Sequence, residues 1–303
     1  MINQTLRPFP TALLDPCVDP IFKALFTSNS KESHQALTCF LSDMVGKTVT
    51  DVVLQPNELS IETATDKQAE FDITCKINGE IVNIEMQGRN ISDNYGKRTE
   101  YHVAHILNHY TPKGTPWENV LKVYQISVLN FVFDEDEVNS YNHYVLKNDN
   151  GHTVSQVINV IFLEIPKIKK LEDDINSLTA VQMWGKFFLY GNVPEKQDFI
   201  IELTKHNRGI QMAFRVLKNI SQDEINWYRE TRYWLHVSDE KTMRNAALRE
   251  GTERGMKKGL SEGSKQTAKQ TVKKLLEMNI LTHDQIAYST GLSIEEIKKL
   301  AGE

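Results

Sequence analysis

Residues 70–87, EFDITCKINGEIVNIEMQ, decide the fold, because they predict a β-hairpin that carries acidic side chains on one face. Asn78-Gly79 is the dipeptide preferred in a two-residue type I′ turn, where both positions need a positive φ. A turn at this point fixes the register of the two strands. Since successive side chains point to opposite faces, the apolar residues share one face, and Asp72 falls opposite Glu85 on the other.

The same register places Glu70 opposite Gln87. Directly paired side chains have Cβ atoms about 4.5–5.5 Å apart, and like charges so placed destabilise a sheet. A divalent cation between Asp72 and Glu85 would turn this repulsion into coordination, because hard cations prefer carboxylate oxygens. The hairpin therefore predicts a metal site at these two acids, with Glu70 either a third acid or a solvated residue at the start of the strand.

The composition is that of a soluble globular protein, with 303 residues of which 40% are hydrophobic and 25% charged. The sequence contains no apolar run of about 18 residues and no signal-peptide pattern, so we expect a cytoplasmic protein without a membrane segment. The three cysteines, Cys17, Cys39 and Cys75, show no CxxC spacing. This pattern predicts reduced thiols and no zinc site.

Hydrophobic periodicity predicts the other elements of the larger, N-terminal part of the chain. Helices are expected at 19–26, 32–45 and 95–110, and strands at 49–55, 122–133, 141–147 and 153–165. The segment 122–133 is rich in Val, Ile and aromatic residues, as in a strand buried on both faces. Residues 171–248 show a helical pattern. The sequence thus predicts an α/β domain with an antiparallel extension and a helical cap.

Residues 241–303 differ from the rest in charge, with a net +4 against −9 for residues 1–240. A basic tail on an acidic body is compatible with phosphate contacts from this region. Four glycines recur at every fourth position, at Gly251, Gly255, Gly259 and Gly263. Each costs a helix about 1 kcal/mol relative to alanine. The stripe predicts either close helix–helix approach in a homo-oligomer or a semi-flexible connector.

The last segment, 281–300, predicts a small helix-turn-helix-like unit. Thr282 and Ser293 are preferred N-cap residues, and acidic residues follow each in the first helical turn. The second helix presents as many acids as lysines, which is not typical of a base-reading surface. The unit is therefore either a DNA reader or a small structural or oligomerising module.

The order helix, strand, acid-bearing hairpin, helix, strand resembles the PD-(D/E)XK nuclease core. More specifically, the chain resembles the recombination-promoting nuclease family of bacterial transposases. The matching segments are DPIFKALF at 19–26, the hairpin at 70–87, RTEYHVAHIL at 98–107, the glycine-punctuated helix and TGLSIEEIKKL at 290–300. The resemblance implies a restriction-endonuclease-like αβββαβ mixed sheet flanked by helices in a domain of residues 1–240, with a helical extension at 241–303.

The resemblance also implies a metal-dependent endonuclease that cleaves double-stranded DNA in recombination or in mobile elements. Asp72 and Glu85 would bind Mg²⁺, or another divalent cation such as Mn²⁺ or Ca²⁺. Asp19 would be either a further metal ligand or only the N-cap of its helix. Gln87 stands at the third catalytic position, where the superfamily usually has lysine, so the expected positive charge is missing there.

Residues that the resemblance places near the scissile phosphate are Arg98 and Tyr101, with Lys23 a further source of positive charge. His102, His105 and His109 follow at helical spacing, as zinc ligands do, but without an HExxH motif they are more typical of a helix face. Because Gln87 is uncharged, a second hypothesis stands beside the nuclease. The protein would then be a catalytically silent DNA-binding or self-associating protein with a nuclease fold.

Overall fold

The computed structural model describes residues 6–56, 72–88 and 94–302. The predicted hairpin forms in it around Asn78 and Gly79, whose φ angles are 46° and 87°. The register runs from Ile77 opposite Glu80 to Ile73 opposite Ile84, as the turn predicts. Positions 70 and 71, with their expected partners, lie outside the described residues.

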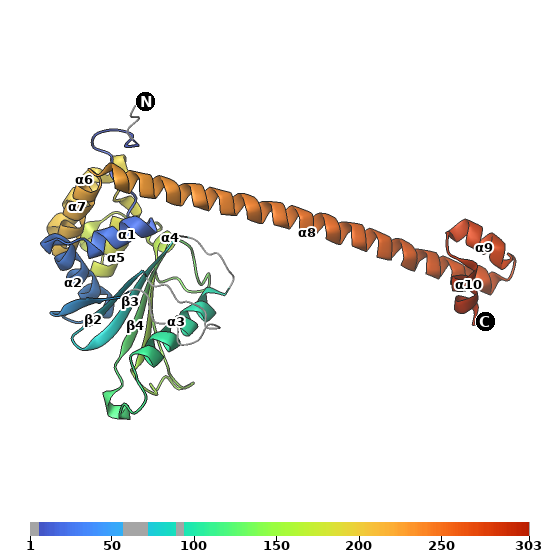
Figure 1. The fold of residues 1–303 in the computed structure, drawn as a ribbon, viewed down its shortest axis with the longest axis horizontal. Coiled ribbons are helices and arrows are strands. Elements are labelled where there is room, and N and C mark those ends of the chain that lie inside the picture. Colours follow the sequence, from blue (N-terminus) through green and yellow to red (C-terminus); the bar gives the residue numbers. More distant parts are fainter. Residues whose placement is uncertain (1–5, 57–71, 89–93, 303) are drawn as a thin grey trace. The chain divides into compact units, whose positions relative to one another are not determined.

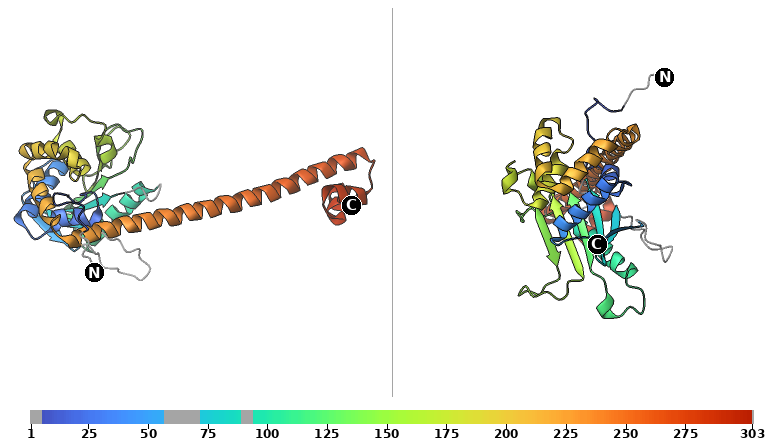
Figure 2. Two further views of the ribbon diagram at one scale, coloured as in Figure 1. Left: turned by 90° about the horizontal axis from the view of Figure 1, so that it is seen from above. Right: turned by 90° about the vertical axis from the view of Figure 1, so that its left-hand side faces the viewer.

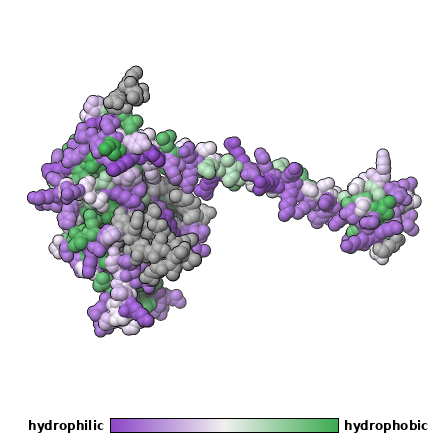
Figure 3. All heavy atoms as spheres, viewed as in Figure 1, coloured by the Kyte–Doolittle hydropathy of each residue, from purple (hydrophilic) through white to green (hydrophobic). Residues whose placement is uncertain are grey.

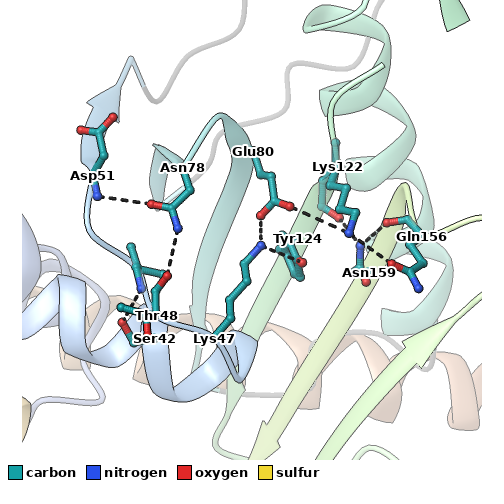
Figure 4. Close-up of polar contacts among 12 residues, drawn as sticks. Ser42, Lys47, Thr48, Asp51, Asn78, Glu80, Lys122, Tyr124, Gln156 and Asn159 are labelled. Carbon is teal, nitrogen blue, oxygen red and sulfur yellow. Dashed lines mark hydrogen bonds and ion pairs between the residues drawn. The ribbon is translucent and has the colours of Figure 1, made fainter. Parts of the chain in front are cut away.

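The turn is held by the chain that precedes the hairpin (Figure 4). Asn78 Oδ1 accepts hydrogen bonds from the backbone N–H groups of Thr50, at 3.2 Å, and Asp51, at 3.4 Å. Its Nδ2 donates to the carbonyl oxygen of Thr48 at 2.9 Å. The asparagine therefore serves both the positive φ of the turn and the docking of the preceding loop, which fixes this end of the sheet.

The described residues form one six-stranded sheet in the order β1-β2-β3-β4-β6-β5. Its strands are β1 (Val52–Gln55), β2 (Ile73–Ile77), β3 (Glu80–Gln87), β4 (Val123–Leu129), β5 (Tyr141–Val145) and β6 (Ile158–Glu164). Strands β3, β4 and β6 run parallel, and all seven residues of β4 are buried, as its apolar run predicts.

The strand predicted at 153–165 starts later in the structure, and its pairing includes a parallel neighbour that the prediction lacked. Strand β6 begins only at Ile158 and pairs parallel with β4, while β5 adds an antiparallel edge. The polar residues Ser155 and Gln156 interrupt the strand pattern before that point. The sheet is therefore one mixed sheet and not a core with a separate antiparallel extension.

Helices cover both faces of this sheet (Figures 1 and 2). The helices of the first unit are α1 (Asp19–Thr27), α2 (Lys31–Val45), α3 (Tyr95–His109), α4 (Ile165–Ile168), α5 (Ala180–Tyr190), α6 (Gln197–His206) and α7 (Arg208–Ile220). The main core joins one sheet face, through residues such as Ile84, to α1, α2, α5, α6 and α7. Helix α3 packs on the other face, where Val103 and Ile106 meet Ile81.

The chain divides into two compact units, Met1–Tyr233 and Trp234–Glu303. Helix α8 (Glu224–Met278) starts in the first unit and continues through the glycine stripe without a break, so the expected connector is helical. A side chain added at any of the four glycines would meet open space. No described segment therefore packs against the stripe, and the side of α8 seen in Figure 3 is mostly hydrophilic.

The second unit closes with α9 (His283–Thr290) and α10 (Ile294–Ala301). Thr282 and Ser293 both form capping boxes, as predicted. A small core of Val272, Ile286 and Ile297 joins these helices to the end of α8. This packing explains why two helices of eight residues each are stable here, since isolated helices of that length are marginal in water.

Across the described ranges, no helix combines the length and the apolar character that crossing a membrane requires. The cysteines Cys17, Cys39 and Cys75 are free thiols, as their spacing predicts. Burial raises the pKa of the Cys75 thiol to about 12. The two buried cysteines are therefore core residues and not reactive groups.

Candidate active site

The predicted site residues gather at one end of the hairpin, opposite to its turn. Asp72 directly precedes β2, and Glu85 and Gln87 lie in the last part of β3. Helix α1 approaches this end from one face of the sheet and α3 from the other. The site is thus assembled from two neighbouring strands and two helices.

In the described part of the chain, Asp72 contacts a backbone group and a cation. Its Oδ2 accepts a hydrogen bond from the backbone N–H of Met86 at 2.8 Å, and its Oδ1 lies 3.1 Å from Lys23 Nζ. Burial, together with the negative charges of Asp19 and Glu85, raises the pKa of Asp72 from 3.8 to about 7, against the opposing effect of Lys23. The carboxyl therefore stands in a site with an excess of negative charge.

Lys23 joins this acid to Asp19, one turn away on α1. Its Nζ lies 3.2 Å from Asp19 Oδ1, and the lysine side chain is 35% exposed. Burial alone would lower the pKa of Lys23, but the carboxylates of Asp72 and Asp19 raise it. Lys23 is thus a fixed positive charge in the site.

The alternative reading of Asp19 as an N-cap is wrong. The N-cap position belongs to Val18, and Asp19 is the first residue of α1. Among the described residues, none donates a hydrogen bond to the buried Asp19 Oδ1, but this oxygen is ion-paired with Lys23, and Oδ2 accepts a hydrogen bond from Lys23 at 3.3 Å. Its side chain is therefore available to the site and is not needed to begin the helix.

Glu85 is almost fully buried, with 2% exposure, and it makes polar contacts with residues of α3 and of its own strand. His102 Nδ1 lies 2.9 Å from Oε1, and Asn83 Nδ2 donates to the same oxygen at 3.2 Å. In the tautomer that carries its hydrogen on Nδ1, the imidazole donates to this carboxylate oxygen. These two donors fix the carboxylate in one orientation.

Gln87 links the second oxygen of this carboxylate to α3. Its Nε2 donates to Glu85 Oε2 at 3.3 Å, and Arg98 donates to its Oε1 at 3.5 Å. The guanidinium of Arg98 also lies 3.8 Å from Glu85 Oε2. The glutamine cannot supply charge, but it orients a residue that does.

Tyr101 lies farther along α3. Its ring stacks on that of His105, with centroids 6.1 Å apart and an angle of 5° between the planes, and the residue is 44% exposed. The structure thus brings Arg98 to the acids and places Tyr101 on the outer side of the helix. The structure also gives the histidines of α3 different partners, because His102 contacts Glu85 and His105 stacks on Tyr101.

A row of buried polar side chains continues from Glu85 across the sheet under α3. Asn83 donates to Gln125 Oε1 at 2.8 Å, and Gln125 donates to Ser127 Oγ at 3.5 Å. All three residues are at most 1% exposed. Buried polar groups connected in this way hold one another in place, so the row stiffens the support of Glu85.

A divalent cation is compatible with these residues by donor chemistry. In the described part of the chain, no three His, Cys, Asp or Glu side chains form a group that could hold an ion by themselves. Mg²⁺, however, commonly uses only one or two carboxylates and completes its shell with water and substrate phosphate. Asp72 and Glu85 supply such a pair, and Asp19, whose Oδ1 is ion-paired with Lys23, adds a further carboxylate.

Two of the residues that hold the site were not identified as such from the sequence, namely His102 and Asn83. A signal for His102 was present. The buried positions of α3 are Tyr95, Thr99, His102, Val103 and Ile106, which follow helical spacing and place the histidine on the inner face. For Asn83, the alternation along β3 places it on the same face as Glu85.

A mixed sheet with carboxylates at the open end of a hairpin, approached by α1 from one face and by α3 from the other, defines a nuclease-like fold of the PD-(D/E)XK class. A family model described as PD-(D/E)XK nuclease family transposase matches residues 16–247. The chain therefore belongs to this family, as the ordered motifs predict. No curated protein and no solved structure matches it.

Proposed function

We propose that the protein is an endonuclease that hydrolyses phosphodiester bonds of double-stranded DNA with the help of Mg²⁺ or another divalent cation. Family membership supports a role as a nuclease or in mobile elements. The observation that carries the proposal is the site itself: Asp72 and Glu85 on neighbouring strands, flanked by the cations Lys23 and Arg98.

Phosphodiester hydrolysis requires an attacking water and stabilisation of the charge that grows on the phosphoryl oxygens. When bound, a divalent cation would lower the pKa of water and neutralise part of this charge. Asp72 and Glu85 would hold it, with Asp19 as a further acid. The contacts of Met86 N–H with Asp72, and of His102 with Glu85, would keep both carboxylates oriented.

The missing lysine at position 87 is compensated in this proposal by two other side chains. Lys23 reaches Asp72 from α1, and Arg98 reaches Glu85 from α3. Arg98 can bind a phosphate with two parallel hydrogen bonds, whereas lysine acts as a compact point charge. Lys23 would thus supply positive charge beside Asp72, and Arg98 would hold the substrate backbone. Tyr101 would contact the backbone farther along α3.

The cleavage proposal is tested by nicking of supercoiled plasmid in Mg²⁺ with wild type, Asp72→Asn and Glu85→Gln. We expect both variants to lose nicking while keeping the thermal unfolding of the wild type. Glu80→Gln is the matched control, because Glu80 lies on the same strand at the turn end, paired with Lys47 (Figure 4). Nicking by both site variants at the rate of this control would refute the assignment.

The uncharged Gln87 also favours a second function, in which the protein binds DNA without cutting it. Gel shifts in the absence of cleavage, in every divalent cation tested, would support this alternative over the first. Self-association through the glycine stripe stays a prediction, since the described residues show only open space beside those glycines. The cytoplasmic location stays a prediction as well.

A further inference from the structure

The solvent side of α3 carries a row of polar residues that includes Arg98 and Tyr101 of the candidate site and extends beyond them. Lys97, Arg98, Tyr101 and His109 are exposed, and His105 is half-buried between them. Their spacing of three or four residues puts them on one side of the helix, opposite the buried Val103 and Ile106. We call these five residues the outer α3 face.

This face has the charge and the donors that a phosphate backbone requires. Lys97 and Arg98 are cations, and the phenol and imidazole groups add hydrogen-bond donors of the kind that contact phosphates. Glu100 is the one acidic residue of α3. At 3.6 residues per turn it lies about 140° around the helix from His105, away from the centre of the face.

The face is continuous with the acids. Arg98 lies 3.8 Å from Glu85 Oε2 and hydrogen-bonds Gln87 at 3.5 Å. From Arg98 to His109 the helix advances by about 16 Å, at roughly 1.5 Å per residue. A duplex carries about one negative charge per 1.7 Å of its axis, so a helix of this length can follow several phosphates.

We propose that the outer α3 face is the docking surface for the backbone of duplex DNA, and that it leads the substrate to Asp72 and Glu85. The inference rests on the proposed nuclease function and specifies how that site receives its substrate. The stacked rings of Tyr101 and His105 form the middle of the surface. Arg98, at the end of this surface nearest the acids, would position the scissile phosphate beside Asp72 and Glu85.

The test is the binding of a dye-labelled duplex oligonucleotide, followed by fluorescence anisotropy at several salt concentrations. All proteins carry Asp72→Asn, so that the DNA stays intact. In this background, Lys97→Ala and the double variant Lys97→Glu with His105→Glu are compared with Lys147→Glu. Lys147 is exposed beyond the edge strand β5, and its change is a charge reversal away from α3. Circular dichroism checks that each variant is folded.

We expect the double variant to raise the Kd for DNA by about tenfold or more, with Lys147→Glu close to the parent protein. Lys97→Ala should reduce the slope of log K against log salt by about 1, the loss of one phosphate contact. Equal Kd values for the double variant and Lys147→Glu would overturn the docking surface. Failure of the proposed function is a separate result, since it appears as intact plasmid with wild-type protein, whatever the variants bind.

Discussion

Replacing Lys23 by methionine removes the positive charge between two acids and leaves the length of the side chain almost unchanged. Lys23 Nζ lies 3.1 Å from Asp72 and 3.2 Å from Asp19. Exposed ion pairs contribute about 0–1 kcal/mol, and removal of one partner from a fully buried pair costs about 3–5 kcal/mol. The lysine is 35% and Asp72 16% exposed. We therefore expect Lys23→Met to lower the free energy of unfolding by about 2 kcal/mol.

The size of this loss depends on pH in a defined direction. The folded pKa of Asp72 is about 7, against an ordinary value of 3.8, and Lys23 lowers it. Without the lysine the folded pKa rises further. A carboxyl with a raised folded pKa binds more protons in the folded state, so stability falls as the pH rises between the unfolded and folded values. The deficit should be small near about pH 5 and full only near about pH 9.

Urea denaturation without divalent cations at both pH values measures the stability, and plasmid nicking in Mg²⁺ measures the activity. Lys47→Met is the matched control, because Lys47 pairs with Glu80 at the turn end with side-chain exposures of 36% and 18%. We expect nicking to fall by about 10²-fold in Lys23→Met and to be unchanged in the control. Wild-type nicking by Lys23→Met, with a stability loss like that of Lys47→Met, would show that Lys23 is an ordinary ion-pair residue.

Two further predictions concern His102 and Glu230. His102→Ala removes the imidazole that contacts Glu85 and should raise the Mg²⁺ concentration for half-maximal nicking by about 10- to 100-fold. His102→Asn keeps a hydrogen-bond donor and should raise this concentration less. Equal Mg²⁺ requirements for the wild type and both variants would contradict the prediction. Burial, with the charge of Asp15, raises the pKa of Glu230 from 4.5 to about 7, so the wild type loses stability as the pH rises through this window. In urea denaturation, the free energy of unfolding of Glu230→Gln should match that of the wild type near about pH 5. Near about pH 8 it should be higher by about 1–2 kcal/mol, after allowance for solvent screening. A variant less stable than the wild type at the higher pH would refute the raised pKa of Glu230.

The hairpin and its register could be read from the sequence because the information is local. Two residues that tolerate positive φ and a strict alternation of apolar side chains determine which residues oppose one another. The same reasoning identified Asp72 and Glu85 as the acids of the candidate site, an assignment that stays a prediction. Helix α3 was also predictable, since its buried positions recur at helical spacing.

The contacts that complete the site depend on packing between distant segments and could not be read in this way. Lys23 reaches Asp72 only because α1 crosses the end of the sheet, and its position in the sequence gives no distance to that acid. The predicted start of β6 was wrong for a related reason. Thr153, Val154 and Val157 have strand-forming side chains, but Ser155 and Gln156 interrupt them. Pairing with β4 begins only at Ile158, and pairing is a tertiary property.

Gly88 follows directly on the strand that ends with Glu85 and Gln87, and it has a neighbour from far along the chain. A side chain at this position would collide with the hydroxyl of Tyr233, in the third turn of α8. The end of β3 and the first turns of α8 therefore approach closely at a position where only glycine leaves the tyrosine in place. A larger residue at 88 would displace the end of the Tyr233 side chain, one residue away from Gln87 of the candidate site.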